Sequence, residues 1–464
     1  PQRSNLTDRG LRTQRRIGTT MIITNGKIVT WGDPNEVLEE KALLIQEGLI
    51  KEISTEEELK ASHPEEEVMD AQGQMVMPGL ICAHTHFYGA FSRGMAIPGE
   101  PSRNFQEILE NLWWKLDKGL DEDGVKYSAS ALLADATRYG CTTLFDHHAS
   151  PSCIDGSLDI EANAVVESGL RASLCYEVTD RDGEAKALAG IRENGRFISG
   201  VKAGNYSPML KAHFGLHASL TVSNETLEKC LIENNGRVGF HTHAAEGIVD
   251  QEDALAKYGK RVVERFADAG VLRDDTILAH GVHVSPHEID LLAQSGTWLS
   301  HQPRSNMNNA VGVAPIEEML KQGVKVCLGN DGFSNAMWQE WFCAYLIQKD
   351  RQADPRAMNG YDVIKMAIEN NSRLASQTWD GLRIGKIEKG AAADLILVDY
   401  HPITPLHAGN LPWHILFGFR DGMVTSTIAG GRLLMKDRKL LLLDEAEIAA
   451  KSREAAIRSW NRVN

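Results

Sequence analysis

The run Met77-Pro78-Gly79-Leu80-Ile81-Cys82-Ala83-His84-Thr85-His86 places two histidines at the end of an apolar stretch. Side chains on an extended strand alternate between its two faces, so the imidazoles of His84 and His86 are expected to point the same way. Two neutral nitrogen donors side by side can hold one transition-metal ion. A single H-x-H pair is weak evidence for a metal site, so its meaning depends on the rest of the chain.

Short apolar strands alternate with longer amphipathic stretches through the middle of the chain. After the strand that ends at the two histidines, seven further strands are expected at residues 142–146, 172–176, 211–216, 238–241, 276–279, 297–300 and 324–328. Helix-like stretches lie between them. Eight alternating β/α units over about 300 residues fit a TIM (β/α)8 barrel better than an open sheet. In such a barrel the carboxyl ends of all strands meet at one mouth, where active sites lie.

Shorter β segments flank this region at both ends of the chain. The step Asn25-Gly26 between two apolar runs predicts a hairpin, and β character returns after residue 371. These flanking segments most simply pair with each other. We therefore predict four parts, namely a disordered extension (1–20), a discontinuous β-sandwich (21–77 and 385–440), a barrel (78–384) and a C-terminal helix (441–464).

Composition narrows the range of partners. The chain has 464 residues, of which 42% are hydrophobic and 24% charged, as in ordinary globular proteins. A net charge of −14 disfavours nucleic acid, and no apolar run approaches the roughly 18 residues that span a bilayer. The seven cysteines are scattered and form no C-x-x-C pair, which is typical of reduced thiols. We expect a cytoplasmic protein that binds neither nucleic acid nor membrane.

Polar residues with metal-binding or acid–base chemistry follow several of the predicted barrel strands. The fifth strand leads into His241-Thr242-His243-Ala244-Ala245-Glu246, and His280, His301 and Asp331 follow the next three. A divalent metal held by three histidines and one carboxylate leaves room for a water, whose pKa it lowers towards neutrality. A nearby carboxylate that is not a ligand can then take the proton of that water, and Glu246 suits this task.

These motifs, in this order, resemble the amidohydrolase superfamily in its aminohydrolase branch, which includes atrazine chlorohydrolase-like, guanine deaminase-like and S-adenosylhomocysteine deaminase-like enzymes. The resemblance covers nearly the whole chain from Met21 and rests on P-G-L-x-x-x-H-T-H, H-A-A-E, A-H-G, H-x-P-x-S-N and N-D-G-x-S-N. The phrases Leu112-Trp113-Trp114-Lys115-Leu116-Asp117 and Asp146-His147-His148-Ala149-Ser150-Pro151 are most similar to the SsnA-type aminohydrolases.

The resemblance implies a role for each matching residue. The metal ligands would be His84, His86, His243 and Asp331. His243 is preferred to His241 because the H-x-x-E spacing of the family links it to Glu246. Glu246 would shuttle protons, His280 would hydrogen-bond the water or the substrate, and Asp331 would also help to activate the water. Binuclear members carry a carboxylated lysine that has no counterpart here, so we expect one ion: zinc by ligand type, with iron, cobalt and manganese as alternatives.

Four further residues are candidates for binding the substrate. They are His217, His301, Arg93 and Asn306. His217 follows the fourth predicted strand, where related enzymes contact their substrates. Two of them have a simpler alternative: His301 could pack or support other groups, and Asn306 could order the seventh loop.

The predicted function is metal-dependent hydrolysis of a carbon–nitrogen bond in a small molecule. Deamination of an amino-substituted N-heterocycle, such as a purine, pyrimidine or triazine, is favoured. One alternative keeps the site but hydrolyses an amide, phenylurea or (thio)carbamate, such as a xenobiotic herbicide. Another is a catalytically inactive barrel that serves in binding or assembly, although all the residues needed for catalysis are present. The resemblance also implies a homo-oligomer.

Overall fold

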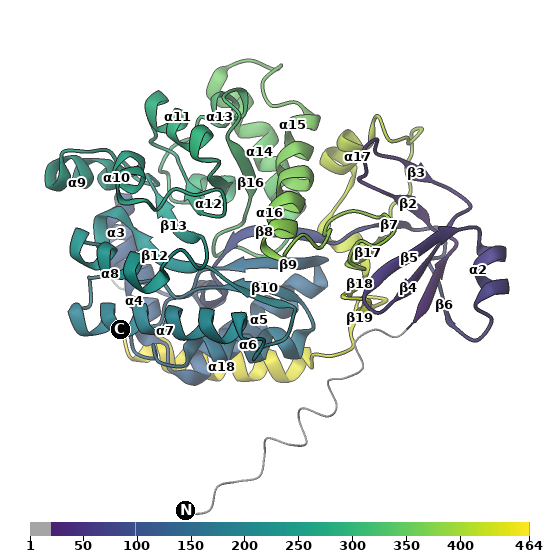
Figure 1. Cartoon of the computed structure of the whole chain (residues 1–464), viewed down its shortest axis with the longest axis horizontal. Coiled ribbons are helices and arrows are strands. Elements are labelled where there is room, and N and C mark those ends of the chain that lie inside the picture. The colour runs from purple at the N-terminus through teal and green to yellow at the C-terminus, as the bar shows by residue number, and fades with distance from the viewer. Residues whose placement is uncertain (1–19, 98, 464) are drawn as a thin grey trace, which may run out of the picture.

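Two parallel sheets form the larger part of the fold (Figure 1). The computed structural model describes residues 20–97 and 99–463, so the predicted extension lies outside the described residues apart from Thr20. One sheet has the strand order β11-β10-β9-β8 and the other has the order β12-β13-β14-β15-β16. The strands are Leu80–Thr85 (β8), Cys141–Asp146 (β9), Arg171–Leu174 (β10), Leu210–Ala212 (β11), Phe214–Ala218 (β12), Phe240–Ala244 (β13), Ile277–His280 (β14), Trp298–His301 (β15) and Lys325–Leu328 (β16).

Backbone hydrogen bonds connect the two sheets at both of their edges. Only His213 separates β11 from β12, and its N–H donates to the carbonyl of Leu174 at 3.2 Å. The single strand predicted over residues 211–216 is therefore interrupted, because its first half pairs with β10 and its second half with β13. At the other edge, the N–H groups of Asn330 and Asp331 donate to the carbonyl of His84 at 2.9 and 3.1 Å. The strand ends that carry the predicted histidines thus face a common region.

Helices alternate with these strands, which confirms the predicted α/β class. The larger ones are Glu122–Arg138 (α5), Ser157–Ser168 (α6), Glu184–Lys202 (α7), Asn224–Asn234 (α8), Ile248–Tyr258 (α9), Val262–Ala269 (α10), Pro286–Ser295 (α11), Met337–Gln352 (α14) and Asn371–Thr378 (α16). Shorter helical segments are Phe105–Ile108 (α3), Leu109–Trp113 (η2), Trp114–Leu116 (α4), Asp117–Gly119 (η3), Pro303–Asn308 (α12), Ile316–Lys321 (α13) and Gly360–Ile364 (α15).

Helix α11 shows how the sequence sets such boundaries. Ser285 caps its N-terminus and forms a capping box with Glu288, while Pro286 occupies the first turn. Gly296 ends the helix with a φ of 66°, a left-handed conformation that glycine adopts without strain.

The remaining strands form two further sheets built from both ends of the chain (Figure 1). One contains Leu49–Ser54 (β5), Ala42–Gln46 (β4), Met21–Thr24 (β1) and Glu67–Asp70 (β6). The other contains, in order, Lys439–Leu440 (β20), Arg432–Lys436 (β19), Val424–Ala429 (β18), Leu395–Val398 (β17), Met75–Pro78 (β7), Lys27–Val29 (β2) and Val37–Leu38 (β3). The antiparallel pair β7–β17 joins the two ends of the chain, and Ile23, Leu43, Val76, Leu397 and Ile428 share one buried apolar cluster.

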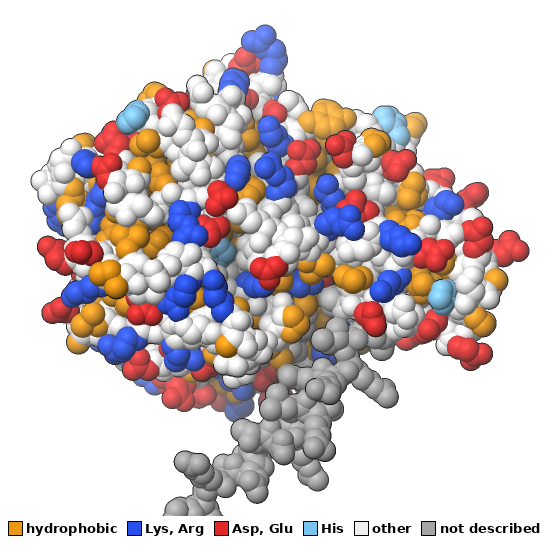
Figure 2. All heavy atoms as spheres, in the orientation of Figure 1, with side chains coloured by type: hydrophobic (Ala, Val, Ile, Leu, Met, Phe, Trp, Pro, Cys, Tyr) orange, Lys and Arg blue, Asp and Glu red, His pale blue; other side chains and the backbone are white. Residues whose placement is uncertain are grey.

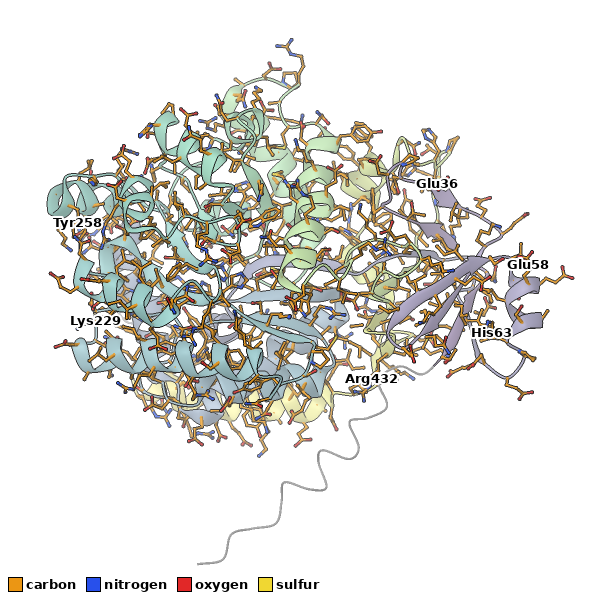
Figure 3. All side chains as sticks on the ribbon, viewed as in Figure 1. Glu36, Glu58, His63, Lys229, Tyr258 and Arg432 are labelled. Atoms are coloured by element: carbon orange, nitrogen blue, oxygen red, sulfur yellow. The ribbon has the colours of Figure 1, made fainter. Side chains whose placement is uncertain are left out.

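Two helices mark how far the molecule extends. Glu58 on helix α2 (Glu56–Ser62) and Lys229 on α8 lie at opposite ends of the molecule (Figure 3). The C-terminal helix α18 (Glu445–Asn461) returns along α5, where Ser452 Oγ donates to the Tyr127 carbonyl at 3.0 Å (Figure 1). A side chain at Gly119 would meet the Ser459 carbonyl oxygen 2.5 Å away, so only glycine allows this close approach.

The surface carries charges of both signs. Lys and Arg side chains are interspersed with Asp and Glu side chains over the face shown in Figure 2. Within residues 20–97 and 99–463, no helix is both long enough and apolar enough to cross a membrane.

A buried ion pair links the parallel sheet of β10 to the mixed sheet of β17. Arg171 Nε lies 2.9 Å from Asp394 Oδ2, and the N–H of Gly430 donates to Asp394 Oδ1 at 2.6 Å. We predict that Asp394→Asn lowers the free energy of unfolding by about 3–5 kcal/mol, because it leaves a buried guanidinium uncompensated. Urea denaturation measures this. The control Asp123→Asn removes the half-exposed partner of Arg458 and should cost no more than about 1 kcal/mol; equal losses would contradict the prediction.

Candidate metal centre

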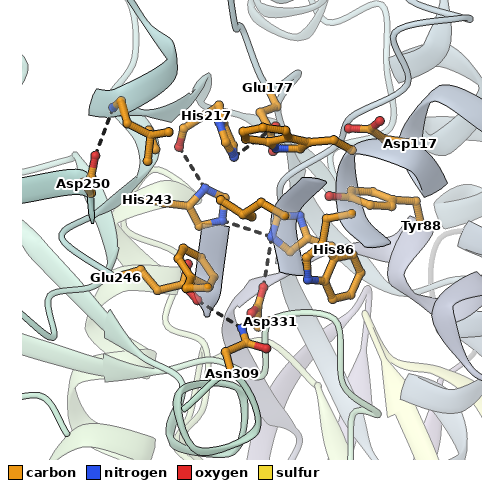
Figure 4. Close-up of a pocket in the computed structure, with 16 residues that line it drawn as sticks. His86, Tyr88, Asp117, Glu177, His217, His243, Glu246, Asp250, Asn309 and Asp331 are labelled. Atoms are coloured by element: carbon orange, nitrogen blue, oxygen red, sulfur yellow. Dashed lines mark hydrogen bonds and ion pairs between the residues drawn. The ribbon is translucent and has the colours of Figure 1, made fainter. Parts of the chain in front are cut away.

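Four side chains converge at the carboxyl ends of β8, β13 and β16. They are His84, His86, His243 and Asp331, and one donor atom from each lies within 4.8 Å of the other three. His86 Nε2 is 3.0 Å from Asp331 Oδ1 and 3.1 Å from His243 Nε2 (Figure 4). His84 Nε2 is 3.5 Å from the same carboxylate oxygen. The structure therefore brings together all four predicted ligands.

Hydrogen bonds from outside the cluster determine which imidazole nitrogen faces it. His243 Nδ1 lies 2.8 Å from the carbonyl oxygen of His217, and His86 Nδ1 is hydrogen-bonded to the carbonyl oxygen of His147. A carbonyl oxygen can only accept, so in both rings Nδ1 carries the hydrogen. Nε2 is then the nitrogen that each ring turns towards the cluster, which is the arrangement that metal-binding histidines adopt.

His84 is oriented by another histidine. Its Nδ1 lies 2.8 Å from His241 Nε2, so His241, the rival candidate for ligand, lies behind His84 instead of in the cluster. His84 Nε2 is fully buried and has no hydrogen-bond partner in the structure. Burial lowers the pKa of His84 to about 3, so the ring is neutral and its lone pair is available. A buried nitrogen of this kind needs a partner, and a metal ion would provide one.

The backbone conformation of Asp331 fixes the position of its carboxylate. Its φ of 59° lies in the left-handed region, which aspartate tolerates better than most residues, and its carbonyl accepts from the N–H of His86 at 3.1 Å. The hydroxyl of Ser305 donates to Oδ2, which leaves Oδ1 facing the histidines. Burial raises the pKa of Asp331, but its close contacts with His84 and His86 and the charge of His86 outweigh burial and hold the pKa well below its usual range.

His86 shows how charge is balanced in the cluster. Burial lowers the pKa of His86, but the hydrogen bond and charge of Asp331, together with the charges of Glu177 and Asp146, outweigh burial and raise the pKa to about 9. A metal ion would therefore displace a proton from this nitrogen when it binds.

An acid–base pair lies beside the cluster. Glu246 Oε2 is 3.4 Å from His280 Nε2. Asn309 Nδ2 donates to Glu246 Oε1 at 3.2 Å (Figure 4). His280 Nδ1 lies 2.8 Å from Asn306 Oδ1, so this nitrogen carries a hydrogen and Nε2 faces the glutamate. Burial raises the pKa of Glu246 to about 7, which allows it both to accept and to release a proton near neutral pH. One donor atom each from Glu246, His280 and Asp331 also lies within 4.8 Å of the others.

A cavity opens onto these groups (Figure 4). One wall is apolar and is formed by Tyr88, Phe105, Leu109, Trp113, Trp114, Ala218 and Leu220. The polar lining consists of His86, Asp117, Glu177, His217, His243, Glu246, Asp250, Asn309 and Asp331. The combination can hold a planar apolar molecule with its reacting atom against the cluster.

The four candidates for substrate binding lie in different places. His217 lines the cavity, whereas within the described residues Arg93, His301 and Asn306 are not among those that do. Arg93 is half-exposed and lies 3.7 Å from Asp135 Oδ1. His301 and Asn306 are buried, and Asn306 bonds His280.

Several lining residues were not singled out from the sequence. Glu177 lies three residues beyond the end of β10 and directly follows the strand expected over residues 172–176, so its position after a strand could have indicated it. Glu177 is buried and lies 3.7 Å from His217 Nε2. Asp117 begins η3 and Asn309 directly follows α12, and no spacing in the sequence points to their position in the cavity.

Such a sheet-and-helix fold, with histidines and an aspartate converging at the strand ends, defines a metal-dependent hydrolase. The amidohydrolase family model matches residues 75–434. The chain belongs to the amidohydrolase family, and it is a hydrolase that acts on carbon–nitrogen bonds, as the sequence predicted.

Individual relatives support this membership. A 5'-deoxyadenosine deaminase from Methanosarcina barkeri is 31% identical over 450 residues, which cover 96% of this chain and 99% of the relative. A 5-methylthioadenosine/S-adenosylhomocysteine deaminase from Syntrophomonas wolfei is 30% identical over 443 residues, covering 94% and 98%. The crystal structure of an adenosine deaminase from Xanthomonas campestris with bound zinc shares the fold, with a TM-score of 0.82, 22% identity, and 95% and 98% coverage.

The geometry generates a test of metal binding. We predict that His243→Ala weakens binding of Zn²⁺ more than about 100-fold, since even outer partners of ligands contribute 10–100-fold. His217→Ala is the matched control, because it keeps the backbone carbonyl that orients His243 and should change the affinity only a few-fold. Competition with a chromogenic chelator measures both values, and equal affinities in the two variants would contradict the assignment.

Proposed function

We propose that this chain is a metal-dependent deaminase of an amino-substituted N-heterocycle. Water replaces the exocyclic amino group, and ammonia leaves. The observation that carries the proposal is the pair Glu246–His280, which faces four convergent metal-binding donors inside a cavity with an aromatic wall. The relatives named as deaminases of adenine nucleosides support the same class of substrate.

The donor set suits one divalent ion. Three imidazole nitrogens and one carboxylate oxygen are ligands that zinc prefers, while iron, cobalt and manganese bind similar sets. We propose His84, His86, His243 and Asp331 as the ligands and zinc as the ion. A bound ion of this charge lowers the pKa of a coordinated water towards neutrality.

Proton transfer is assigned to the neighbouring residues. Glu246 accepts a proton from the attacking water and gives it to the leaving nitrogen, and its pKa near 7 suits both steps. His280 holds Glu246 Oε2, and Asn309 holds Oε1, so the carboxylate keeps one orientation. Asn306 fixes the ring of His280 through Nδ1 and therefore acts on the pair without touching the substrate.

The walls of the cavity suggest how a heterocycle is held. Trp113, Trp114 and Phe105 offer aromatic faces to a planar ring. His217, with Glu177 beside it, offers polar groups for ring nitrogens or for hydroxyl groups of a sugar.

Further features are proposals of the same kind. The hydrogen bonds at both sheet edges support closure of the two parallel sheets into one eight-stranded barrel. We also propose a discontinuous β-sandwich domain, a homo-oligomer in solution and a cytoplasmic location.

A substrate screen tests the proposal. We predict release of ammonia from 5'-deoxyadenosine or 5-methylthioadenosine by the Zn²⁺-loaded chain, with adenosine, guanine and aminotriazines as further members of the panel. Glu246→Gln should lower turnover by about 10²–10⁴-fold while the zinc content stays unchanged. Amine release from phenylureas or thiocarbamates, without any ammonia from the heterocycles, would instead favour the alternative hydrolase. No turnover on either panel would overturn the proposal.

The pH dependence follows from Glu246. Its carboxylate must be ionised to accept a proton, and burial raises the pKa from 4.5 to about 7, while a nearby cation lowers it again. We predict that kcat/KM falls on the acidic side with a midpoint between these two values. A pH–rate profile measures this, and a flat profile across that interval would exclude Glu246 as the base.

A further inference from the structure

A second group of potential ligands lies behind the site, away from the cavity. It consists of Asp146 at the end of β9, His148 two residues later and Glu161 on α6, and one donor atom from each lies within 4.8 Å of the others. All three side chains are fully buried, and none lines the cavity. We call this group the β9–α6 cluster.

Four atoms of the β9–α6 cluster have no hydrogen-bond partner outside the cluster. They are Asp146 Oδ2, His148 Nδ1, Glu161 Oε1 and Glu161 Oε2. The closest approach between residues is 2.8 Å, from His148 Nδ1 to Glu161 Oε1. Buried polar atoms are almost always partnered, so four unpartnered atoms pointing at one another require a ligand or shared protons.

A hydrogen bond to one ring nitrogen determines the tautomer of His148, as it does for His86 and His243. Its Nε2 lies 2.8 Å from Ser150 Oγ, and that hydroxyl already donates its hydrogen to the Cys153 carbonyl at 2.7 Å. Ser150 Oγ must therefore accept from Nε2–H, which leaves Nδ1 with the lone pair in a neutral ring. Burial also lowers the pKa of His148 to about 4, which favours the neutral ring.

The charge of the β9–α6 cluster is not balanced by the protein. Within the described residues, no lysine or arginine forms an ion pair with Asp146 or Glu161. Two buried carboxylates without a cation are costly, and burial accordingly raises the pKa of Glu161 to about 8. One divalent cation would cancel both charges and would partner all four atoms at once.

We propose that Asp146, His148 and Glu161 bind a second divalent cation with a structural role. One nitrogen and three carboxylate oxygens, with Glu161 binding through both of its oxygens, complete a four-atom donor set of the kind zinc accepts. The ion would tie α6 to the end of β9, and it would exchange slowly because its ligands are inaccessible to solvent.

This second ion would also brace the first site. Asp146 Oδ1 accepts from the N–H of Phe87 at 2.7 Å, directly after the ligand His86. The residue between Asp146 and His148 is His147, whose carbonyl orients His86 Nδ1. Fixing both neighbours of His147 therefore fixes the carbonyl that sets the geometry of His86.

Metal counting tests the proposal. The full-length chain is loaded with ZnCl₂, passed through a desalting column and analysed by mass spectrometry of the elements. We expect two zinc ions in the wild type and one each in Glu161→Gln and His243→Ala. Glu193→Gln is the matched control, because Glu193 is also buried beside α6 but accepts from the N–H of Leu158 at 3.1 Å, and it should keep two ions.

Other counts would overturn the proposal. One zinc in the wild type, or two in Glu161→Gln, means that shared protons satisfy the β9–α6 cluster. If Glu161→Gln does not fold, anomalous diffraction at the zinc edge from wild-type crystals decides: a peak between the three side chains supports the proposal, and its absence excludes it. If the wild type binds one zinc ion and His243→Ala binds none, the proposed deaminase function stands and the second site is excluded.

Discussion

The carbonyl oxygen of His84 holds the active region together. It accepts from the N–H groups of both Asn330 and Asp331, and so fastens the end of β16 to β8. The first and last of the parallel strands are distant in sequence, yet this bond places the Asp331 carboxylate within 3.0 Å of His86 Nε2. Without it, the carboxylate and the two histidines proposed as ligands would belong to separate edges of separate sheets. The left-handed conformation of Asp331 allows its side chain and its backbone to serve this junction together.

Around that junction, the orientation of the imidazole rings is set by atoms that take no part in the reaction. Carbonyl groups of His147 and His217 choose the nitrogen that His86 and His243 present, and Asn306 does the same for His280. Backbone carbonyls are dependable in this task because a side-chain substitution does not remove them. The chemistry of the cavity can therefore be varied through its aromatic wall without disturbing the groups that hold the ligands.

Residues at strand ends were predictable from the sequence, because strands could be recognised and their ends converge. His84, His86, His243, Glu246, His280 and Asp331 all belong to this class. Residues such as Asp117 and Asn309 enter the cavity from the ends of helical segments, whose path is decided by packing and not by a local pattern. The interruption at His213 has a similar cause, since the N–H of His213 donates to Leu174 in one sheet, whereas the N–H of Phe214 donates to Gly239 beside the other. Arg93 has the right chemistry for a ligand contact, but its half-exposed side chain extends towards Asp135.

The pairing of β7 with β17 has a consequence for how the chain is made. The strand Met75–Pro78 leaves the ribosome early, but its antiparallel neighbour Leu395–Val398 is synthesised only after every strand of the two parallel sheets. Until then β7 has an exposed edge, and exposed edges invite pairing with other chains. The parallel-stranded part can assemble first, and its completion carries the late strand back to the early one. A chain that terminates before residue 395 would therefore keep the edge of β7 exposed and able to pair with other chains, however well the central part had folded.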